Sequence, residues 1–214
     1  MPLPSYPAAQ TGLLLVDPYN DFLSEGGKLS GHAQAVADAV GTLENMRQVV
    51  AAVRAAGIQV FYVPHHRSRP GDFSAWRHMS PYLQGSHRAQ VFAVGTWGGE
   101  WHPDFQPQPG DVMVQEHWAS SGFANTDLDL QLRRHGVDQV IVVGMLANTC
   151  IETTAKYAAE LGYHVTLVRD ATAAFSHEAM HAAHAINGPT YAHAILTTQE
   201  VMAALTNGAT EKLA

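Results

Sequence analysis

The cysteine at position 150 lies where an apolar run gives way to a helical pattern. It is the single cysteine of the chain, in the segment VVGMLANTCIETTAKYAAELGY. The free N–H groups and the positive end of a helix favour a thiolate, and they can hold an oxyanion once the sulfur has attacked a carbonyl. The alternative is a small buried hydrophobic residue, the commonest fate of a free cysteine. Cys150 is therefore a candidate nucleophile.

Asp17 is the second candidate, in the segment LLLVDPYNDF. It ends an apolar run directly before Pro18, so its carboxylate is expected at the C-terminal edge of a sheet. There it could take the proton of a thiol that lies at the end of a neighbouring strand. The competing interpretation is a turn aspartate that hydrogen-bonds the backbone of the next residues.

Aromatic and histidine side chains could complete a substrate pocket. Trp118, Phe123 and Phe22 would give an apolar wall for a small acyl or aromatic group, although core packing is the competing interpretation and is favoured for Phe22. His65 and His66, in VPHHRSRPGDF, follow a predicted strand. They either contact the substrate or are solvated loop residues.

The segment HEAMH, residues 177–181, matches the H-E-x-x-H pattern of zinc proteases. In that pattern two histidines on one helical face bind zinc and the glutamate acts as a base. The match is short, and the nearest further histidine, His184, lies on the same predicted helix. We attribute the match to chance and expect neither a metal nor another cofactor.

Short apolar runs alternate with stretches of helical period, which is typical of a parallel sheet with crossover helices. Helices are predicted over residues 36–53, over 126–135, from Cys150 to before Gly162, after Ser176 and after Thr198. The predicted strands are residues 12–16, 59–63, 112–115, 139–143, 164–168 and 192–196.

The stretch 64–110 breaks this alternation and is rich in proline and tryptophan. Long insertions inside compact domains are usually functional lids or binding loops. We expect one domain over residues 1–214 with 64–110 as its lid. In such a sheet the ligand lies beyond the C-terminal ends of the strands, so Asp17, His117 and Gly144 are expected near it.

Composition excludes several classes of function. Twelve basic and 19 acidic residues give a formal charge of -7, which repels phosphate backbones, so we expect no nucleic-acid partner. The N-terminal segment has no basic region followed by a long apolar run, so we expect no membrane insertion. A lone cysteine fits a reducing compartment, and we expect a cytoplasmic protein.

Three motifs in this order resemble the isochorismatase-like cysteine hydrolase superfamily, from about Thr11 to Thr198. They are VDPYNDF, HWASSGFANTDLDLQLR and VVGMLANTCIETTAKYAAELGYHVTLVRDATAA. The resemblance implies a Rossmann-like α/β/α fold with a mainly parallel six-stranded sheet. It also implies that Asp17 is the general base and Cys150 the nucleophile. A cis peptide would join Met145 to Leu146, with the oxyanion hole at the N–H groups of Leu146 and Cys150.

The sequence departs from the family at the third catalytic position. The family has a lysine six residues before the phenylalanine of the central motif, and counting back from Phe123 gives His117. The three lysines of the chain, Lys28, Lys156 and Lys212, lie elsewhere in the sequence. Lysine holds its charge at neutral pH whereas histidine titrates near it. Either His117 replaces the lysine functionally, or the site is weakened.

The resemblance implies hydrolysis of a C–N bond of a small-molecule substrate, in an amide, carbamoyl compound or hydrazide, through a thioester. Two alternatives stay open. One is vinyl-ether hydrolysis of the isochorismatase type, which uses the aspartate without the cysteine. The other is ligand binding without turnover, because the lysine is missing. Nicotinamidases carry a metal on an Asp-x-His pair, and this sequence has none. Members of the family commonly assemble, so a homo-oligomer, either a dimer or a tetramer, is expected.

Overall fold

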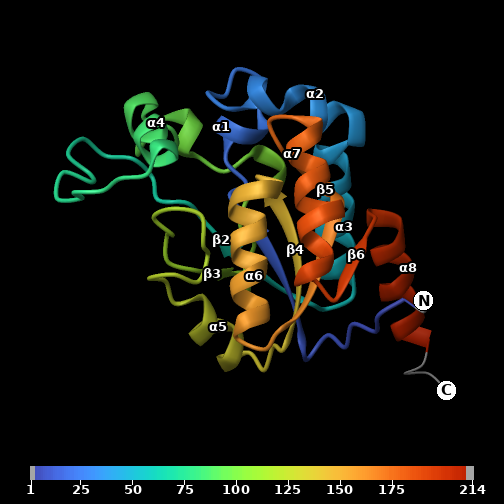
Figure 1. Ribbon diagram of the computed structural model, residues 1–214. Coiled ribbons are helices and arrows are strands. Elements are labelled where there is room, and N and C mark those ends of the chain that lie inside the picture. Colours follow the sequence, from blue (N-terminus) through green and yellow to red (C-terminus); the bar gives the residue numbers. More distant parts are fainter. Residues whose placement is uncertain (1–2, 211–214) are drawn as a thin grey trace.

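The computed structural model describes residues 3–210, whose core is a parallel sheet between two layers of helices (Figure 1). Its six strands lie in the order β3-β2-β1-β4-β5-β6, and every neighbouring pair is parallel. This confirms the α/β fold class. The strands are β1 (Thr11–Val16), β2 (Gln59–Val63), β3 (Val112–Met113), β4 (Gln139–Met145), β5 (His164–Ala173) and β6 (Ala194–Leu196).

Helices cover both faces of the sheet. The longer ones are α2 (Ser30–Val40), α3 (Thr42–Ala55), α4 (Pro81–Ala89), α6 (Glu152–Glu160) and α8 (Thr198–Thr210). The shorter ones are α1 (Asn20–Leu23), α5 (Leu128–Arg134) and α7 (His177–His181). Each predicted strand and most predicted helices are therefore present, with bounds that differ by a few residues at several ends.

Alternating side chains of the central strands build two hydrophobic cores. In β1, Leu13 and Leu15 pack in one cluster with α3 and α8, whereas Leu14 and Val16 pack in another with α5 and α6. Successive side chains of a strand point to opposite faces, so a continuous apolar run is the expected pattern for a strand buried on both sides. Packing on both faces holds β1 and β4 in place. Asp17 follows the end of β1, and Cys150 lies in the turn after β4.

One predicted helix is interrupted. The sequence favours one helix over residues 36–53, but the chain forms α2 and α3, which meet at Gly41. Gly41 has a φ of 70°, in the left-handed region that glycine adopts without steric cost. The hydrophobic period continues across this turn, so period alone does not reveal the break.

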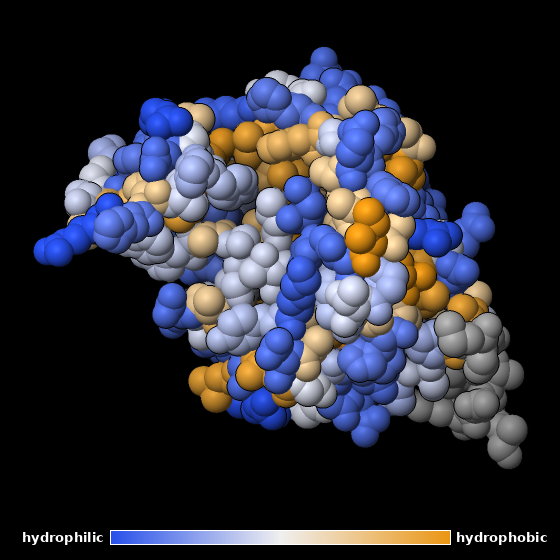
Figure 2. Space-filling view, in the orientation of Figure 1, coloured by the Kyte–Doolittle hydropathy of each residue, from blue (hydrophilic) through white to orange (hydrophobic). Residues whose placement is uncertain are grey.

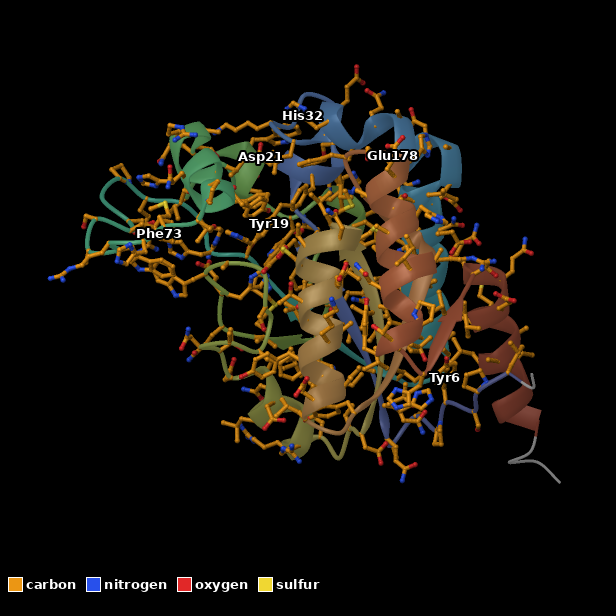
Figure 3. All side chains as sticks on the ribbon, in the orientation of Figure 1. Tyr6, Tyr19, Asp21, His32, Phe73 and Glu178 are labelled. Atoms are coloured by element: carbon orange, nitrogen blue, oxygen red, sulfur yellow. The ribbon has the colours of Figure 1, made fainter. Side chains whose placement is uncertain are left out.

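The insertion 64–110 forms a lobe beside the C-terminal ends of the strands, and the loop between β2 and α4 projects farthest from the sheet (Figure 1). Asp21 of α1 attaches this lobe to the sheet, because its Oδ2 accepts a hydrogen bond of 2.6 Å from the backbone N–H of Phe92. Tyr19, which is labelled in Figure 3, also packs on Phe92, with ring centroids 5.0 Å apart. Asp21 is therefore a structural residue, and its bond reaches a segment far along the chain. No helix within residues 3–210 is long and apolar enough to span a membrane.

Candidate active site

Asp17 is the first residue beyond β1 and is completely buried. Its backbone N–H donates to the carbonyl of Val63, and its φ of 53° turns the chain sharply out of the strand. Gly144 of β4 lies against the same strand end, and a Cβ there would come within 2.0 Å of the carbonyl oxygen of Val16. A side chain at position 144 would therefore push β4 away from the end of β1.

His117 lies beside Asp17 because its segment pairs with the chain that leaves β2. Its N–H donates to the carbonyl of Pro64, and its own carbonyl accepts from the N–H of His66, both at 2.8 Å. The imidazole Nε2 lies 3.1 Å from Oδ1 of Asp17, and Nδ1 lies 3.0 Å from the carbonyl oxygen of Ala119. The imidazole of His117 and the carboxylate of Asp17 are shielded from solvent, since both side chains are 0% exposed.

The partners of His117 decide which nitrogen carries a proton. A carbonyl oxygen only accepts hydrogen bonds, so Nδ1 of His117 must carry a hydrogen to bond Ala119. A hydrogen bond between Nε2 and Asp17 then needs a second proton, held either on the imidazole or on the carboxyl group. The two residues therefore share one proton. Their pair is neutral overall, as a lysine–aspartate pair would be.

Cys150 completes the group from the other side of β1. It lies in η3 (Ala147–Ile151), a π-helical turn that joins β4 to α6, and it is completely buried. One ligand atom each from Asp17, His117 and Cys150 lie within 4.8 Å of one another. Burial, and then the negative charge of Asp17, hold the pKa of the Cys150 thiol well above its usual range. The helix N-terminus was expected to favour a thiolate, but these two effects outweigh it.

The backbone around Leu146 faces the cysteine. The peptide bond between Met145 and Leu146 is cis. A backbone hydrogen bond from Leu146 acts in the opposite direction to burial and lowers the pKa of Cys150. An N–H group that reaches the sulfur can also reach an oxygen on a carbon bonded to that sulfur. This geometry is suited to an oxyanion hole.

Tyr82 of α4 belongs to the same region, although no sequence motif indicates it. Burial raises the pKa of its phenol, and the nearby acidic groups of Cys150 and Asp17 raise it further. Hydrogen bonds with the side chains of Thr149 and Ser86 act in the opposite direction. Because α4 comes from the insertion, only the three-dimensional fold brings this tyrosine to the cysteine.

Of the two histidines that follow β2, His65 lies against the site. It is 4% exposed, and its ring centroid lies 5.1 Å from that of His117. Its Nδ1 bonds the carbonyl of His66 and so carries the hydrogen, whereas its buried Nε2 has no hydrogen-bond partner. Burial, with the nearby His117, lowers the pKa of His65 to about 4. His65 is therefore a neutral ring that lies against His117, and its buried Nε2 keeps a free lone pair.

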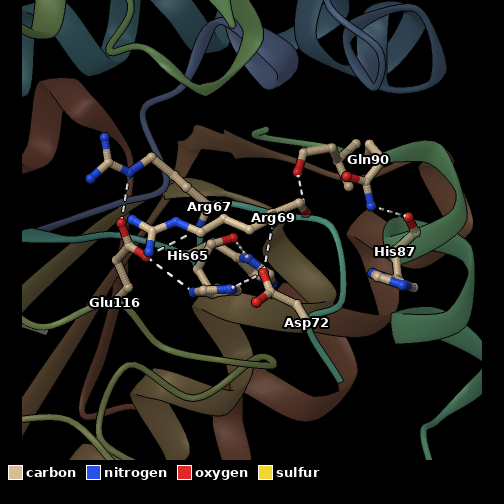
Figure 4. A network of polar contacts seen from close by, with 10 residues as sticks. His65, Arg67, Arg69, Asp72, His87, Gln90 and Glu116 are labelled. Carbon is tan, nitrogen blue, oxygen red and sulfur yellow. Dashed lines mark hydrogen bonds and ion pairs between the residues drawn. The ribbon is translucent and has the colours of Figure 1, made fainter. Parts of the chain in front are cut away.

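His66 instead bonds two acidic residues, Asp72 of the insertion and Glu116 beyond it, which are both labelled in Figure 4. Its Nε2 lies 2.7 Å from Asp72 and its Nδ1 lies 3.1 Å from Glu116, while Arg67 bonds the other oxygen of Glu116 at 2.6 Å. Its ring also stacks on Trp118, with centroids 3.9 Å apart. These contacts tie the start of the insertion to the segment that carries His117.

We expect this network to stabilise the fold most between about pH 4.5 and 6.5. Burial opposes both shifts, but hydrogen bonds lower the pKa of Glu116 to about 2 and raise that of His66. The contribution of Glu116 is present above the ordinary glutamate pKa of 4.5 and is lost as the pH falls toward 2. The contribution of His66 is present below 6.5 and is lost as the pH rises through its folded-state pKa.

Thermal unfolding of Glu116→Gln at several pH values tests this expectation. The substitution should lower the melting temperature most at about pH 5.5 and less at a pH above the folded-state pKa of His66, where that imidazole has lost its charge. Glu160→Gln is the matched control, since Glu160 is exposed on α6. An equal loss for Glu116→Gln at both pH values would contradict the assigned network.

The aromatic candidates divide between the core and the lobe. Phe22 is buried against Tyr19 and Phe92, as the core interpretation predicts. Phe123 belongs to the cluster that contains Cys150 and stacks on Tyr157. Trp118 stacks on His66. The apolar substrate wall that the sequence predicts from Phe22, Phe123 and Trp118 stays a prediction.

The HEAMH segment forms α7, and His177, Glu178 and His181 are exposed on it. Ser176 caps the helix by accepting a hydrogen bond from the N–H of Ala179, as predicted. Within the described part of the chain, the group of three or more potential ligands that lies close enough for one metal ion is Asp17, His117 and Cys150. The HEAMH histidines have no third ligand there.

The structure has two hollows that could admit a substrate. A cavity of about 600 Å³ is lined by α2, by the turn after α1 and by the start of α3, with Met145 at its edge, but it does not include Asp17, His117 or Cys150. The face in Figure 2 is also hollowed between α4 and α7, and apolar residues gather there. Since η3 contacts α7, this second hollow lies on the side of the molecule that carries Cys150. We regard it as the better candidate for a substrate entrance, because α7 contacts η3, the turn that carries Cys150.

The described lysines bond groups outside the site of Asp17, His117 and Cys150. Lys28 bonds the carbonyl of Gln90, and Lys156 pairs with Glu152. Lys212 lies outside the described residues. Among the described lysines, none replaces His117 beside Asp17.

Curated proteins similar to this chain include amide hydrolases. Ureidoacrylate amidohydrolase RutB of Rhizobium rhizogenes is 34% identical over 178 residues, which cover 77% of this chain and 70% of the relative. The protein of the same name from Agrobacterium fabrum is 33% identical, and the match covers 77% of this chain and 76% of that protein.

Solved structures give the same result for the fold. A cysteine hydrolase of Pseudomonas syringae pv. phaseolicola 1448A superposes with a TM-score of 0.78 at 27% identity, over 97% of this chain and 99% of that one. The N-carbamoylsarcosine amidase of Thermoplasma acidophilum superposes with a TM-score of 0.64 at 27% identity, over 88% and 96%. The family model of the isochorismatase domain matches residues 11–200. This chain belongs to the isochorismatase domain family, as its three motifs predict.

Proposed function

We propose that the protein is a cysteine hydrolase that cleaves a C–N bond of a small molecule, with Cys150 as nucleophile and Asp17 as general base. The observation that carries the proposal is the buried group of Asp17, His117 and Cys150, whose reactive atoms lie within 4.8 Å. A nucleophile, a proton acceptor and a third group that orients the acceptor form the usual arrangement of covalent catalysis. The relatives named as amidohydrolases support the same reaction.

In the first step the Cys150 sulfur attacks the carbonyl carbon and its proton passes to Asp17. The raised pKa of Cys150 means that the resting residue is a thiol, so the proton must leave as the S–C bond forms. The negative oxygen of the tetrahedral intermediate accepts hydrogen bonds from the N–H groups of Leu146 and Cys150. His117 holds Asp17 in place through its contact of 3.1 Å.

In the second step the intermediate collapses, the C–N bond breaks, and a proton from Asp17 goes to the departing nitrogen. A thioester or carbamoyl thioester remains on Cys150. Water then attacks this thioester, Asp17 takes the proton of the water, and the thiol is restored when the acid product leaves. Both half-reactions use one carboxyl group alternately as base and acid.

The substrate class follows from the shape of the site and from the relatives. The names of the relatives specify ureidoacrylate and N-carbamoylsarcosine as their substrates, both of which carry a carbamoyl nitrogen. We infer that the insertion 64–110 acts as a lid that selects the substrate, with Tyr82 of α4 as its contact to the reacting group. His65 offers the free lone pair of its Nε2 to a substrate N–H.

A panel of small ureido, carbamoyl, amide and hydrazide compounds tests the proposal, with release of ammonia or amine as the readout. We expect ureido or carbamoyl compounds to be hydrolysed fastest, with loss of turnover in Cys150→Ala. Cleavage of a vinyl ether, with none of the C–N compounds turned over, would contradict the proposal.

The reaction uses no metal, so chelators should leave the activity of the purified enzyme unchanged. The exposed histidines of α7 have no third ligand among the described residues, which is why HEAMH is not expected to act. Activity after dialysis against EDTA measures this directly. Loss of activity that added zinc restores would show that a metal takes part.

Assembly and compartment stay predictions. We propose a homo-oligomer, a dimer or a tetramer, of a single-domain chain in the cytoplasm. Light scattering on the purified protein measures the assembly state, and a monomer over the working concentration range would contradict it.

A further inference from the structure

The three reactive side chains also form a set of metal ligands. A thiolate, an imidazole and a carboxylate are the ligand types that zinc takes in proteins, whereas magnesium and calcium prefer oxygen alone. The ligand atoms of Cys150, His117 and Asp17 lie within 4.8 Å of one another. Zinc bonds of about 2.0–2.3 Å would bring them somewhat closer, which rotation of the side chains can supply.

Two unpaired acceptors at the site point independently to a cation. Oδ2 of Asp17 is buried without a hydrogen-bond partner, and so is Nε2 of His65, whose ring lies against that of His117. A buried acceptor that lacks a donor is costly, so an incoming donor or cation is favoured there. His117 also matters, because its Nδ1 already bonds the carbonyl of Ala119, an arrangement that orients the Nε2 of metal-binding histidines.

We propose that Asp17, His117 and Cys150 form a site for Zn²⁺ whose occupation blocks hydrolysis. Binding replaces the proton of the thiol and the proton that His117 and Asp17 share. One Zn²⁺ therefore enters, two protons leave to solvent, and the bound ion is held by one sulfur, one nitrogen and one oxygen. The sulfur can then no longer attack a carbonyl. This inference goes beyond the proposed function, since hydrolysis itself uses no metal.

Equilibrium dialysis with Zn²⁺, followed by metal analysis, measures the binding. We expect one ion per chain for the wild type and a loss of at least about tenfold in affinity for Cys150→Ser and His117→Lys, because a protonated lysine has no lone pair to donate. The double variant His177→Gln and His181→Gln is the matched control and should bind as the wild type does, since those residues lie on α7. Circular dichroism shows whether each variant is folded.

Co²⁺ as a spectroscopic substitute identifies the ligands. A sulfur-to-cobalt charge-transfer band should appear in the wild type and the α7 variant and be absent from Cys150→Ser. With an amide substrate, turnover of the wild type should fall in step with zinc occupancy and return on addition of EDTA. Undiminished binding in Cys150→Ser, or loss of binding in the α7 variant, would overturn the proposal. So would absence of zinc binding in an active wild type, and that result would leave the proposed hydrolysis standing.

Discussion

Cys150→Ala is expected to lower kcat/KM for C–N hydrolysis by about four orders of magnitude or more, because no other group can form the thioester. The fold should survive, since a buried cysteine packs as a small apolar side chain and alanine leaves only a small cavity. Steady-state kinetics on one carbamoyl or amide substrate measures the loss.

The same variant separates the two reactions of the family. Hydrolysis of a vinyl ether needs an acid near Asp17 but no thiol, so that activity would persist in Cys150→Ala. Cys150→Ser is the matched control, because it keeps the volume and a weak nucleophile. Full activity of the alanine variant on a C–N substrate would rule out covalent catalysis and leave Asp17 as the residue to test.

The second large effect is expected at His117. His117→Ala should lower kcat/KM by about a hundredfold or more, because the buried carboxylate of Asp17 would lose its hydrogen-bond partner. His117→Lys should keep more activity than His117→Ala, since an ammonium group can supply the proton that His117 and Asp17 share. Kinetics of the variants on one substrate measures the effect.

His117→Gln is the control that isolates the proton. Glutamine can donate an amide N–H to Asp17, but it cannot carry the extra proton. We expect it to restore the melting temperature more than the activity. Wild-type activity in His117→Ala would show that His117 is a bystander.

The sequence predicts the fold well because buried strands appear as continuous apolar runs and helices as apolar residues at helical spacing. The strands β1, β2 and β4 are buried on both faces, and each is an uninterrupted apolar run. The turn at Gly41 is harder to predict, because the hydrophobic period continues across it. The lobe after β2 has no period of its own, so its helix α4 does not emerge from the pattern.

The sequence also predicts some residues of the site and misses others. Asp17 and Cys150 end or follow strands of one parallel sheet, so topology brings them to the same edge. Tyr82 reaches them from the insertion, and no local signal marks it. The charge balance between Asp17 and His117 depends on which atoms face Nδ1 and Nε2, and that is a property of the fold alone.

The pKa of Cys150 shows the limit of local reasoning most clearly. Its position at a helix N-terminus favours a thiolate, whereas full burial beside a carboxylate raises the pKa and keeps the proton on sulfur. The aspartate that accepts the proton also disfavours its loss in the resting state. Sequence motifs locate both residues but do not reveal which effect is larger.

Mass spectrometry of the protein quenched in acid during turnover tests most directly whether Cys150 is the nucleophile. We expect a covalent adduct with the mass of the acyl or carbamoyl group, located by peptide mapping on Cys150, absent from Cys150→Ala and longer-lived in Asp17→Asn. Rapid turnover of a C–N substrate with no adduct in either the wild type or Asp17→Asn, or an adduct on another residue, would contradict it.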